Sequence, residues 1–496
     1  MSLLDEHVRA EPRAEIAAPQ APAAVEAPRG IETHSIDWVP DAERRGRVAH
    51  LGAVWFVGNI NLTAMATGVA ALSIGASLFW TLVATVLGSL FGTFFMAFHS
   101  AQGPQLGLPQ LVQSRPQFGY IGAAVTVWVF ALVNYIAYNT SDAILSGSAM
   151  HSLVHVPAEA GYVIAAAVAA VIAIFGYHWI HRVNRWLAWP LVIVMAILTV
   201  AAFTNSGLAA GAFAPGAFAL APTMTVFVIV AGFQLGWAPY VSDYSRYLPA
   251  GVGVRATFWW TYLPSALSAI WVFVLGAVMS AGAPKGATVV GAFRAAGDSL
   301  VGGFGGIAVA ALLIGLLSVM AINQYGGSLS MISIADSVRR VRATRRARVL
   351  TILAMALVVW AIAQLVGEDR FNSFYANVLI FLTYLFTPWT AINLVDFFFV
   401  RRGVYTIGEI FNPRGIYGRW GWRGNVAYLT ALAAMVPFFV TTPYTGPAAA
   451  ALGGVDWSLF VGLAVAAPLY VLFCRGLDLR AERRLAEQEG RLALEH

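Results

Sequence analysis

Long apolar runs recur along almost the whole chain, and short polar stretches separate them. Twelve of these runs have the length that a helix needs to cross a bilayer, about 20 residues. We place them near residues 49–74, 78–99, 118–150, 159–179, 186–204, 223–248, 256–281, 302–335, 348–366, 371–400, 424–443 and 456–475. The pattern therefore predicts an all-α integral membrane protein with 12 transmembrane helices.

Composition agrees with this prediction and adds the boundaries of the folded part. The chain is 59% hydrophobic and 11% charged, whereas a soluble protein carries roughly 25% charged residues. Residues 1–45 are rich in Ala, Pro and Glu and predict a disordered tail. We predict that residues 46–480 form one integral membrane domain and that residues 481–496 form a C-terminal tail. The single cysteine, Cys474, excludes internal disulfides and a cysteine-ligated metal cluster.

The basic residues predict the orientation in the membrane. With the N-terminus in the cytoplasm and alternating spans, only Lys285, Arg294 and Arg370 of the 30 basic residues fall outside, which leaves 27 inside. Cytoplasmic loops carry such an excess. One missed span would reverse half of the loops, so we predict that both termini are cytoplasmic in the cell membrane. The net charge of +6 thus indicates orientation and not a nucleic-acid partner.

The stretch Gly236–Pro249, GWAPYVSDYSRYLP, places polar and helix-breaking residues in the sixth apolar run. Pro239 cannot donate a backbone hydrogen bond, and lipid tolerates freed backbone only where it is buried in protein or lines a cavity. Asp243 and Arg246 are three residues apart and can pair on one helix face. The alternative is a proline kink followed by the cytoplasmic end of a plain helix.

The first run has a similar interruption. Its middle, WFVGNINLTAMATG, contains Asn59, Asn61 and Thr63. Two broken helices five segments apart favour an inverted five-plus-five repeat, about 49–204 and 223–400, with two extra helices at 424–475. Glycines that allow close helix packing are the alternative, but they leave the asparagines unexplained.

Polar residues at membrane depth are the candidate functional residues. Asp142 has no basic residue within one helical turn, and Tyr138 lies four residues before it on the same face. This pair could stack on a flat heterocycle and accept its N–H groups, and the carboxylate could carry a proton. The alternative places Asp142, solvated, near the outer end of a tilted helix. Asn323 and Gln324 in the eighth run face a cavity or form interhelical hydrogen bonds.

Enzymatic activity has no support in the sequence. We find no Walker A motif that would drive transport with ATP, no nucleophile–base pair and no metal-ligand spacing. We therefore expect a protein that is not an enzyme and has no cofactor.

The chain resembles the nucleobase–cation symporters of the purine–cytosine permease family over about residues 50–420. The motifs that carry the resemblance are NINLTAMATG, SRPQFGYIG at Ser114–Gly122, GWAPYVSDYSRYLP, SVMAINQYGGSLS, and DFFFVRRGVY at Asp396–Tyr405. The resemblance implies a LeuT-like fold and secondary active import of a small heterocycle, cytosine or a purine, with H⁺ or Na⁺. It implies no oligomeric state.

The resemblance also implies a substrate site. Family members hold the base between an aromatic residue on the third segment, here Tyr138, and one on the sixth. They place an amide four residues after the first aromatic residue, where this chain departs with Asp142. Asn323 matches an asparagine that contacts the base. The candidates for the aromatic position on the sixth segment are Phe233, Gln234 and Trp237. Further polar candidates for substrate contact are Asn59, Asn61 and Gln324.

Coupling to protons is favoured over sodium. Sodium-coupled relatives use carbonyls of the first segment and adjacent hydroxyls on the eighth, where this chain offers Ser318 beside Leu317. Thr63 and Asp142 are the other coupling candidates. Alternative substrates within the family are uracil, allantoin, hydantoin and a vitamin such as thiamine. A channel or a non-transporting membrane sensor is the alternative of another class; a channel needs a continuous polar pore, whereas the polar residues here cluster at one depth.

Overall fold

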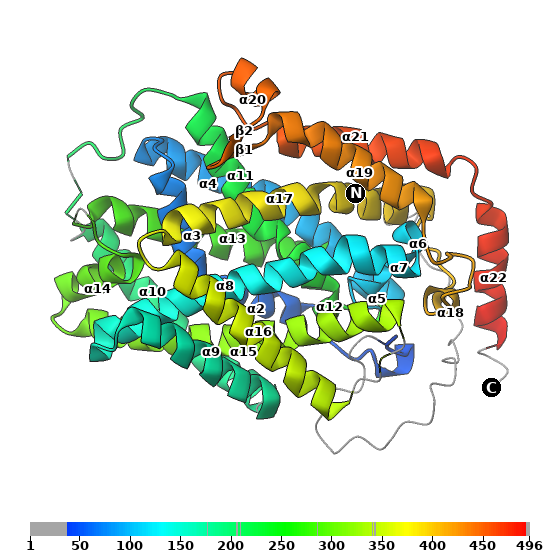
Figure 1. Ribbon diagram of the computed structural model, residues 1–496, viewed down its shortest axis with the longest axis horizontal. Helices are drawn as coiled ribbons and strands as arrows, with labels where there is room; N and C mark the ends of the chain where they lie inside the picture. Colours follow the sequence, from blue (N-terminus) through cyan, green and yellow to red (C-terminus); the bar gives the residue numbers. More distant parts are fainter. Residues whose placement is uncertain are drawn as a thin grey trace.

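The computed structural model describes residues 37–492, apart from 176, 205–206, 209, 285, 340 and 342–343. Helices run side by side through the molecule and make up nearly all of it (Figure 1). In this part of the chain, eight helical stretches are long and apolar enough to cross a membrane, or ten if each bent helix pair counts as one span. The predicted class, an all-α membrane protein, is confirmed, while the number of 12 transmembrane helices stays a prediction.

Each predicted apolar run overlaps a helix. The first five runs correspond to α2 (Ala49–Gly58) with α3 (Leu62–Ser73), α4 (Leu78–Ser100), α8 (Val129–Val154), α9 (Ala158–Phe175) and α10 (Tyr177–Thr204). The next five correspond to α11 (Leu220–Leu235) with α12 (Val241–Ser245), α13 (Gly253–Gly282), α15 (Phe304–Val338), α16 (Arg345–Val366) and α17 (Phe371–Val395). The last two are α19 (Trp422–Met435) and α21 (Ser458–Cys474). With 14 residues, α19 is shorter than a full span.

Short elements fill the connections. The polar stretch 99–119 contains α5 (Gln102–Leu106) and α6 (Arg115–Phe118). The helix α7 (Tyr120–Ala123) and a π-helical turn (Ala124–Trp128) lead into α8. Further short elements are α14 (Val289–Leu300), α18 (Ile407–Ile410), β1 (Val440–Thr441), β2 (Tyr444–Thr445) and α20 (Pro447–Ala451). Short 3₁₀ helices lie at Asp41–Glu43, Val112–Ser114, Ala250–Val252 and Val436–Phe438. The two strands pair antiparallel.

Small residues let the central helices approach closely. The helix α13 packs against both α3 and α4, and α4 also packs against α11. A Cβ atom on Gly68 of α3 would lie 1.9 Å from the carbonyl oxygen of Phe273, and one on Gly276 of α13 would lie 2.0 Å from that of Met65. Because neither position has room for a side chain, the two helix backbones can touch, as small residues allow in membrane interfaces.

Both predicted helix breaks are present. The chain bends by 56° between α2 and α3. In the second break, α11 ends at Leu235 and a 3₁₀ turn, Ala238–Tyr240, precedes α12. Pro239 lies inside this turn, where its missing N–H removes a helical hydrogen bond. The α-helical hydrogen bonds are thus interrupted in this stretch. Leu220–Ser245 nevertheless qualifies as one span, so a proline kink before the end of the helix stays an alternative.

The predicted N-terminal tail is described only from Asp37 on; residues 1–36 lie outside the described part. From there the chain packs against the loop after α5. The Val39 amide donates to the carbonyl of Gly107 at 2.9 Å, and the buried Arg44 donates to the carbonyls of Val39 at 2.8 Å and Pro104 at 3.1 Å. Hydrogen bonds to backbone carbonyls thus hold residues 37–45 in place. The composition of this segment does not predict these contacts.

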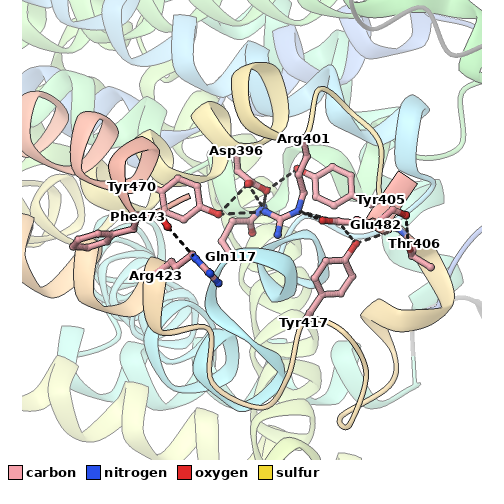
Figure 2. A network of polar contacts seen from close by, with 10 residues as sticks. All are labelled: Gln117, Asp396, Arg401, Tyr405, Thr406, Tyr417, Arg423, Tyr470, Phe473 and Glu482. Carbon is pink, nitrogen blue, oxygen red and sulfur yellow. Dashed lines mark hydrogen bonds and ion pairs between the residues drawn. The ribbon is translucent and has the colours of Figure 1, made fainter. Parts of the chain in front are cut away.

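The predicted C-terminal tail begins inside a helix, α22 (Leu479–Leu492), which turns by 82° from α21. A buried polar network fastens α22 to the rest of the protein (Figure 2). Arg401 forms ion pairs with Asp396, from the π-helical end of α17 (Asp396–Val400), and with Glu482 of α22, 2.9 Å away. Tyr417 also donates to Glu482, at 2.6 Å.

Asp396 accepts from three further side chains. Gln117 of α6 donates to it at 2.6 Å, and the hydroxyls of Tyr405 and Tyr470 donate at 2.9 Å each. Burial alone would lower the pKa of Arg401, but the carboxylates of Asp396 and Glu482 beside it raise this pKa above its ordinary value. The network therefore holds a permanent charge between two acids, and it joins α22 and α17 to the segment that leads into α8.

Candidate functional site

A small cavity of about 40 Å³ lies where the two broken helices meet α8 and α15. It is lined by Asn61, Thr63, Asn134, Tyr135, Tyr138, Asp142, Phe233, Gly236, Trp237, Tyr240, Val319 and Asn323. This volume holds about three water molecules, so a heterocycle can enter only if lining side chains move. The structure thus brings together Tyr138, Asp142 and Asn323, which the sequence predicted as one site.

Asn61 shapes the first break. As the N-cap of α3, it has extended backbone torsions, and its side-chain oxygen accepts from the amide of Ala64 at 2.8 Å. Its amide nitrogen donates to the carbonyl of Gly58 at 2.8 Å. One side chain therefore satisfies a backbone group on each side of the break, which is how an asparagine stabilises a helix start. Asn61 lines the cavity, but both of its polar atoms are in use.

Asp142 is 1% exposed, so it is not the solvated carboxylate of the alternative prediction. Thr63 of α3 donates a hydrogen bond to its Oδ1 atom. Its Oδ2 atom is buried and accepts no hydrogen bond from the described residues. Among the described residues that line the cavity, none is a lysine or an arginine. A carboxylate in such a place is costly to keep charged, and the cost disappears when it binds a proton or a donor.

Aromatic rings form the walls on either side. Tyr138 contacts Phe233 edge-on, with ring centroids 5.8 Å apart, and lies 6.4 Å from the ring of Tyr375. Phe233 is buried and Trp237 is partly buried. Of the three sixth-segment candidates, Phe233 and Trp237 line the cavity. The aromatic residues of the predicted sandwich therefore line one cavity, and the sandwich itself stays a prediction.

Three candidate amides point elsewhere. Asn59 donates to Ser265 and Ser268 of α13, at 3.0 and 3.1 Å. Gln234 donates to Thr93 of α4 at 2.6 Å and to Ser265 at 3.2 Å. Gln324 donates to the carbonyl of Ala166 in α9 at 3.3 Å. These amides connect helices, the role that the alternative prediction gave to the amides of the eighth segment, and we no longer place them in the substrate site.

Ser318 is also absent from the lining of the small cavity, although it is buried in α15. Thr63 does line the cavity, and its backbone carbonyl accepts from the hydroxyl of Tyr375 at 3.1 Å. Of the predicted coupling residues, Thr63 and Asp142 are therefore in contact with each other, and Ser318 lies apart from the cavity.

Asp243 and Arg246 lie at the end of the second break, each with a partner from another segment. Asp243 accepts from the backbone amide of Gln110 at 2.9 Å. Arg246 is 2% exposed and donates to the carbonyl of Asp37 at 3.2 Å and to the hydroxyl of Tyr247 at 3.0 Å. Both side chains thus bind the end of the broken helix to neighbouring segments, and their mutual ion pair stays a prediction.

A second, larger cavity of about 310 Å³ adjoins the first. The two share Tyr135, Trp237, Tyr240 and Asn323 as lining residues. The larger one extends along α12 and the end of α15, where Asp243 and Arg246 lie. These four residues therefore lie at the boundary between the two spaces.

Five lining residues were not among the predicted site residues: Asn134, Tyr135 and Tyr240, which have polar side chains, and Gly236 and Val319. The ring centroids of the two tyrosines lie 4.6 Å apart. Asn134 lies one turn before Tyr138 on α8, so the i, i+4 spacing that singled out Asp142 could also have found it. Tyr240 follows Pro239, but the direction of its side chain depends on the 3₁₀ turn. The helical period of the sequence does not predict this turn.

The fold and the site define a membrane transporter: a helical membrane protein with two broken helices around a buried polar cavity. Comparison with known proteins identifies the family. The family model described as permease for cytosine/purines, uracil, thiamine, allantoin matches residues 38–462. The chain belongs to this family of permeases, and it is not an enzyme.

Two relatives show the extent of the similarity. The putative purine-cytosine permease YxlA of Bacillus subtilis is 34% identical over 464 residues, which cover 92% of this chain and 98% of that one. The purine-cytosine permease fcyB of Emericella nidulans is 28% identical over 462 residues, covering 89% of this chain and 88% of that one.

Solved structures support the fold. The inward-facing conformation of Mhp1 is similar with a TM-score of 0.72 and 18% identity, covering 95% of this chain and 99% of the other. Mhp1 in a closed conformation with bromovinylhydantoin bound, described as a nucleobase-cation-symport-1 family transporter, has a TM-score of 0.63, 20% identity, and coverage of 91% and 97%. The LeuT-like fold is thus confirmed, while the inverted repeat within this chain stays a prediction.

Proposed function

We propose that this protein is a secondary active symporter that imports a nucleobase, cytosine or a purine, together with protons. Membership of the permease family supports the transport of a small heterocycle. The relatives named as purine-cytosine permeases support a nucleobase as that heterocycle. The cavity at the broken helices is the proposed binding site, with Tyr138 and Trp237 as the aromatic walls and Asn323 as the amide that pairs with the base.

The buried carboxylate of Asp142 is the observation that carries the coupling proposal. It lies in the same cavity as the proposed substrate contacts, with Thr63 as its donor and no basic side chain among the lining residues that the structure describes. A proton taken up there removes the cost of a buried charge. A proton and a base that meet in one cavity can favour each other's binding, which is the coupling that a symporter requires. Sodium at Ser318 is the competing proposal.

Access from one side at a time is supported by the cavities. The space of about 310 Å³ adjoins the site through shared lining residues. A third cavity, of about 260 Å³, lies beyond Asp142 along α8 and is lined by Ser148, Glu368 and Asp369 among others. Among its described lining residues, none also lines the small cavity. The distribution of arginines supports a cytoplasmic side for the first opening and an outer side for the second.

Uptake into proteoliposomes tests the proposal. Purified protein is reconstituted, and a panel of radiolabelled cytosine, purines, uracil, allantoin, hydantoin and thiamine is offered under an imposed pH gradient or an imposed sodium gradient. We expect accumulation of cytosine or a purine under the pH gradient alone. Accumulation that needs sodium contradicts the proton proposal, and transport of none of the bases contradicts the substrate class. Asp142→Asn is the control for the role of the carboxylate.

A further inference from the structure

Asn134 has a fixed position at the second helix break. It lies on α8, is 3% exposed and lines the small cavity. Its side-chain nitrogen, Nδ2, donates to the carbonyl of Gly236 at 3.3 Å and to the hydroxyl oxygen of Tyr240 at 3.0 Å. Gly236 is the C-cap residue that directly follows the end of α11 at Leu235, so Asn134 stabilises backbone that the break has freed.

The hydrogen bonds also fix which way the carboxamide faces. The Tyr240 hydroxyl donates its only proton to the carbonyl of Ala131 at 2.9 Å. Its oxygen must therefore accept from Asn134, and the carbonyl of Gly236 can only accept. Both partners thus require the amide nitrogen on their side, and the Oδ1 atom faces away from them.

This Oδ1 atom is buried and accepts no hydrogen bond from the residues that the structure describes. A buried acceptor without a donor costs free energy, and such atoms commonly mark a place where a ligand or water binds. Asp142 provides a second such acceptor in the same cavity, because its Oδ2 atom is also buried and accepts no hydrogen bond from the described residues.

The two acceptors flank an aromatic ring. Asn134, Tyr138 and Asp142 are spaced four residues apart and lie along one side of α8. At 1.5 Å per residue, the first and the last are separated by about 12 Å along the helix axis, with Tyr138 midway. The arrangement matches a flat molecule that lies against the ring and has N–H groups at both ends.

We propose that Asn134 binds the substrate directly: its Oδ1 atom accepts from an N–H group on the edge of the heterocycle that faces away from Asp142. The ligand class is a planar heterocycle with an N–H donor on that edge. At the opposite edge, Asp142 accepts from an N–H group when it is ionised and donates to a ring acceptor when it holds the coupling proton. This inference rests on the proposed function and adds a residue that determines specificity. The same side chain joins ligand recognition to the broken helix, because its nitrogen holds Gly236 while its oxygen holds the base.

Single N-methyl groups on the ligand test this assignment. Binding of adenine, guanine, hypoxanthine and cytosine to the full-length protein in detergent is measured by calorimetry, followed by the derivatives of the tightest binder that carry one methyl group on a ring nitrogen or on the exocyclic amine. We expect one such methyl group to weaken binding to wild type by about ten- to hundredfold, the effect of one unsatisfied buried group. In Asn134→Ala, the parent base should bind more weakly and this methyl penalty should disappear.

Asn139→Ala is the matched control. Asn139 is a buried asparagine on the same helix, donates to the carbonyl of Tyr135 at 3.1 Å and does not line the cavity. This variant should keep the wild-type methyl penalty at every position. If Asn134→Ala does not fold, Asn134→Leu repeats the test with a side chain of similar size.

The outcomes distinguish this inference from the proposed function. If a base binds and every methyl penalty persists in Asn134→Ala or Asn134→Leu, the assignment of Asn134 is overturned while the nucleobase site stands. If wild type binds none of the bases, the proposed function fails and the inference fails with it. Loss of one methyl penalty in the Asn134 variants, with retention in Asn139→Ala, supports both.

Discussion

Replacing Asp396 with alanine should destabilise the protein more than replacing Glu482, the other acid in the polar network of Figure 2. Asp396 is 0% exposed and accepts from Arg401, Gln117, Tyr405 and Tyr470. Removing one partner of a buried ion pair costs about 3–5 kcal/mol, because the other charge stays buried. Glu482 still pairs with Arg401 in this variant, which lowers the cost. The side chains that donated to Asp396 lose their acceptor, which raises the cost.

Glu482→Ala should cost less, about 1–3 kcal/mol. In that variant Arg401 keeps Asp396, and Glu482 is 8% exposed, so water can reach the vacated position. Glu487→Ala is the control, since Glu487 is an exposed acid on the same helix, α22. Apparent unfolding temperatures in detergent, followed by size-exclusion chromatography after heating, should decrease most for Asp396→Ala, less for Glu482→Ala and not for Glu487→Ala. Equal shifts for the first two variants would refute the reasoning.

The remaining predictions concern the cavity and the second break. Asn323→Ala should weaken base binding in calorimetry by about ten- to hundredfold, and unchanged affinity would show that Asn323 only packs helices. Asp142→Asn should fold but lose much of the pH dependence of uptake, and an unaltered pH profile would exclude its role in coupling. Thr63→Val should change that profile because it removes the donor to Asp142, whereas Thr63→Ser should not. Asp243→Ala should lower transport, and exchanging Asp243 with Arg246 should partly restore it; if the exchange is as inactive as either single change, they do not act as a pair.

The sequence was most informative where a residue conflicts with its surroundings. Pro239 and Asn61 are unfavourable in a plain membrane helix, and both lie at breaks. Asp142 is unfavourable in lipid, and it is buried in the cavity between the broken helices. In each case a strong local penalty permits few structural solutions, so the residue type alone indicated the site.

The direction of an amide could not be predicted in the same way. Gln234 and Trp237 are three residues apart beside the same break, yet Gln234 donates to α4 and Trp237 lines the cavity. The helix ends between them at Leu235, so the faces before and after it follow no common period. Asn59 and Gln324 likewise found partners on helices distant in sequence, and tertiary packing alone decides such contacts.

A structure of the protein with its tightest-binding base tests the central claim most directly. Our account predicts density for the base in the cavity between α8 and the break after α11, stacked on Tyr138 or Trp237, with Asn323 and Asn134 within hydrogen-bond distance of its edges. Density at another place, with these side chains unchanged and the cavity empty, would contradict the account.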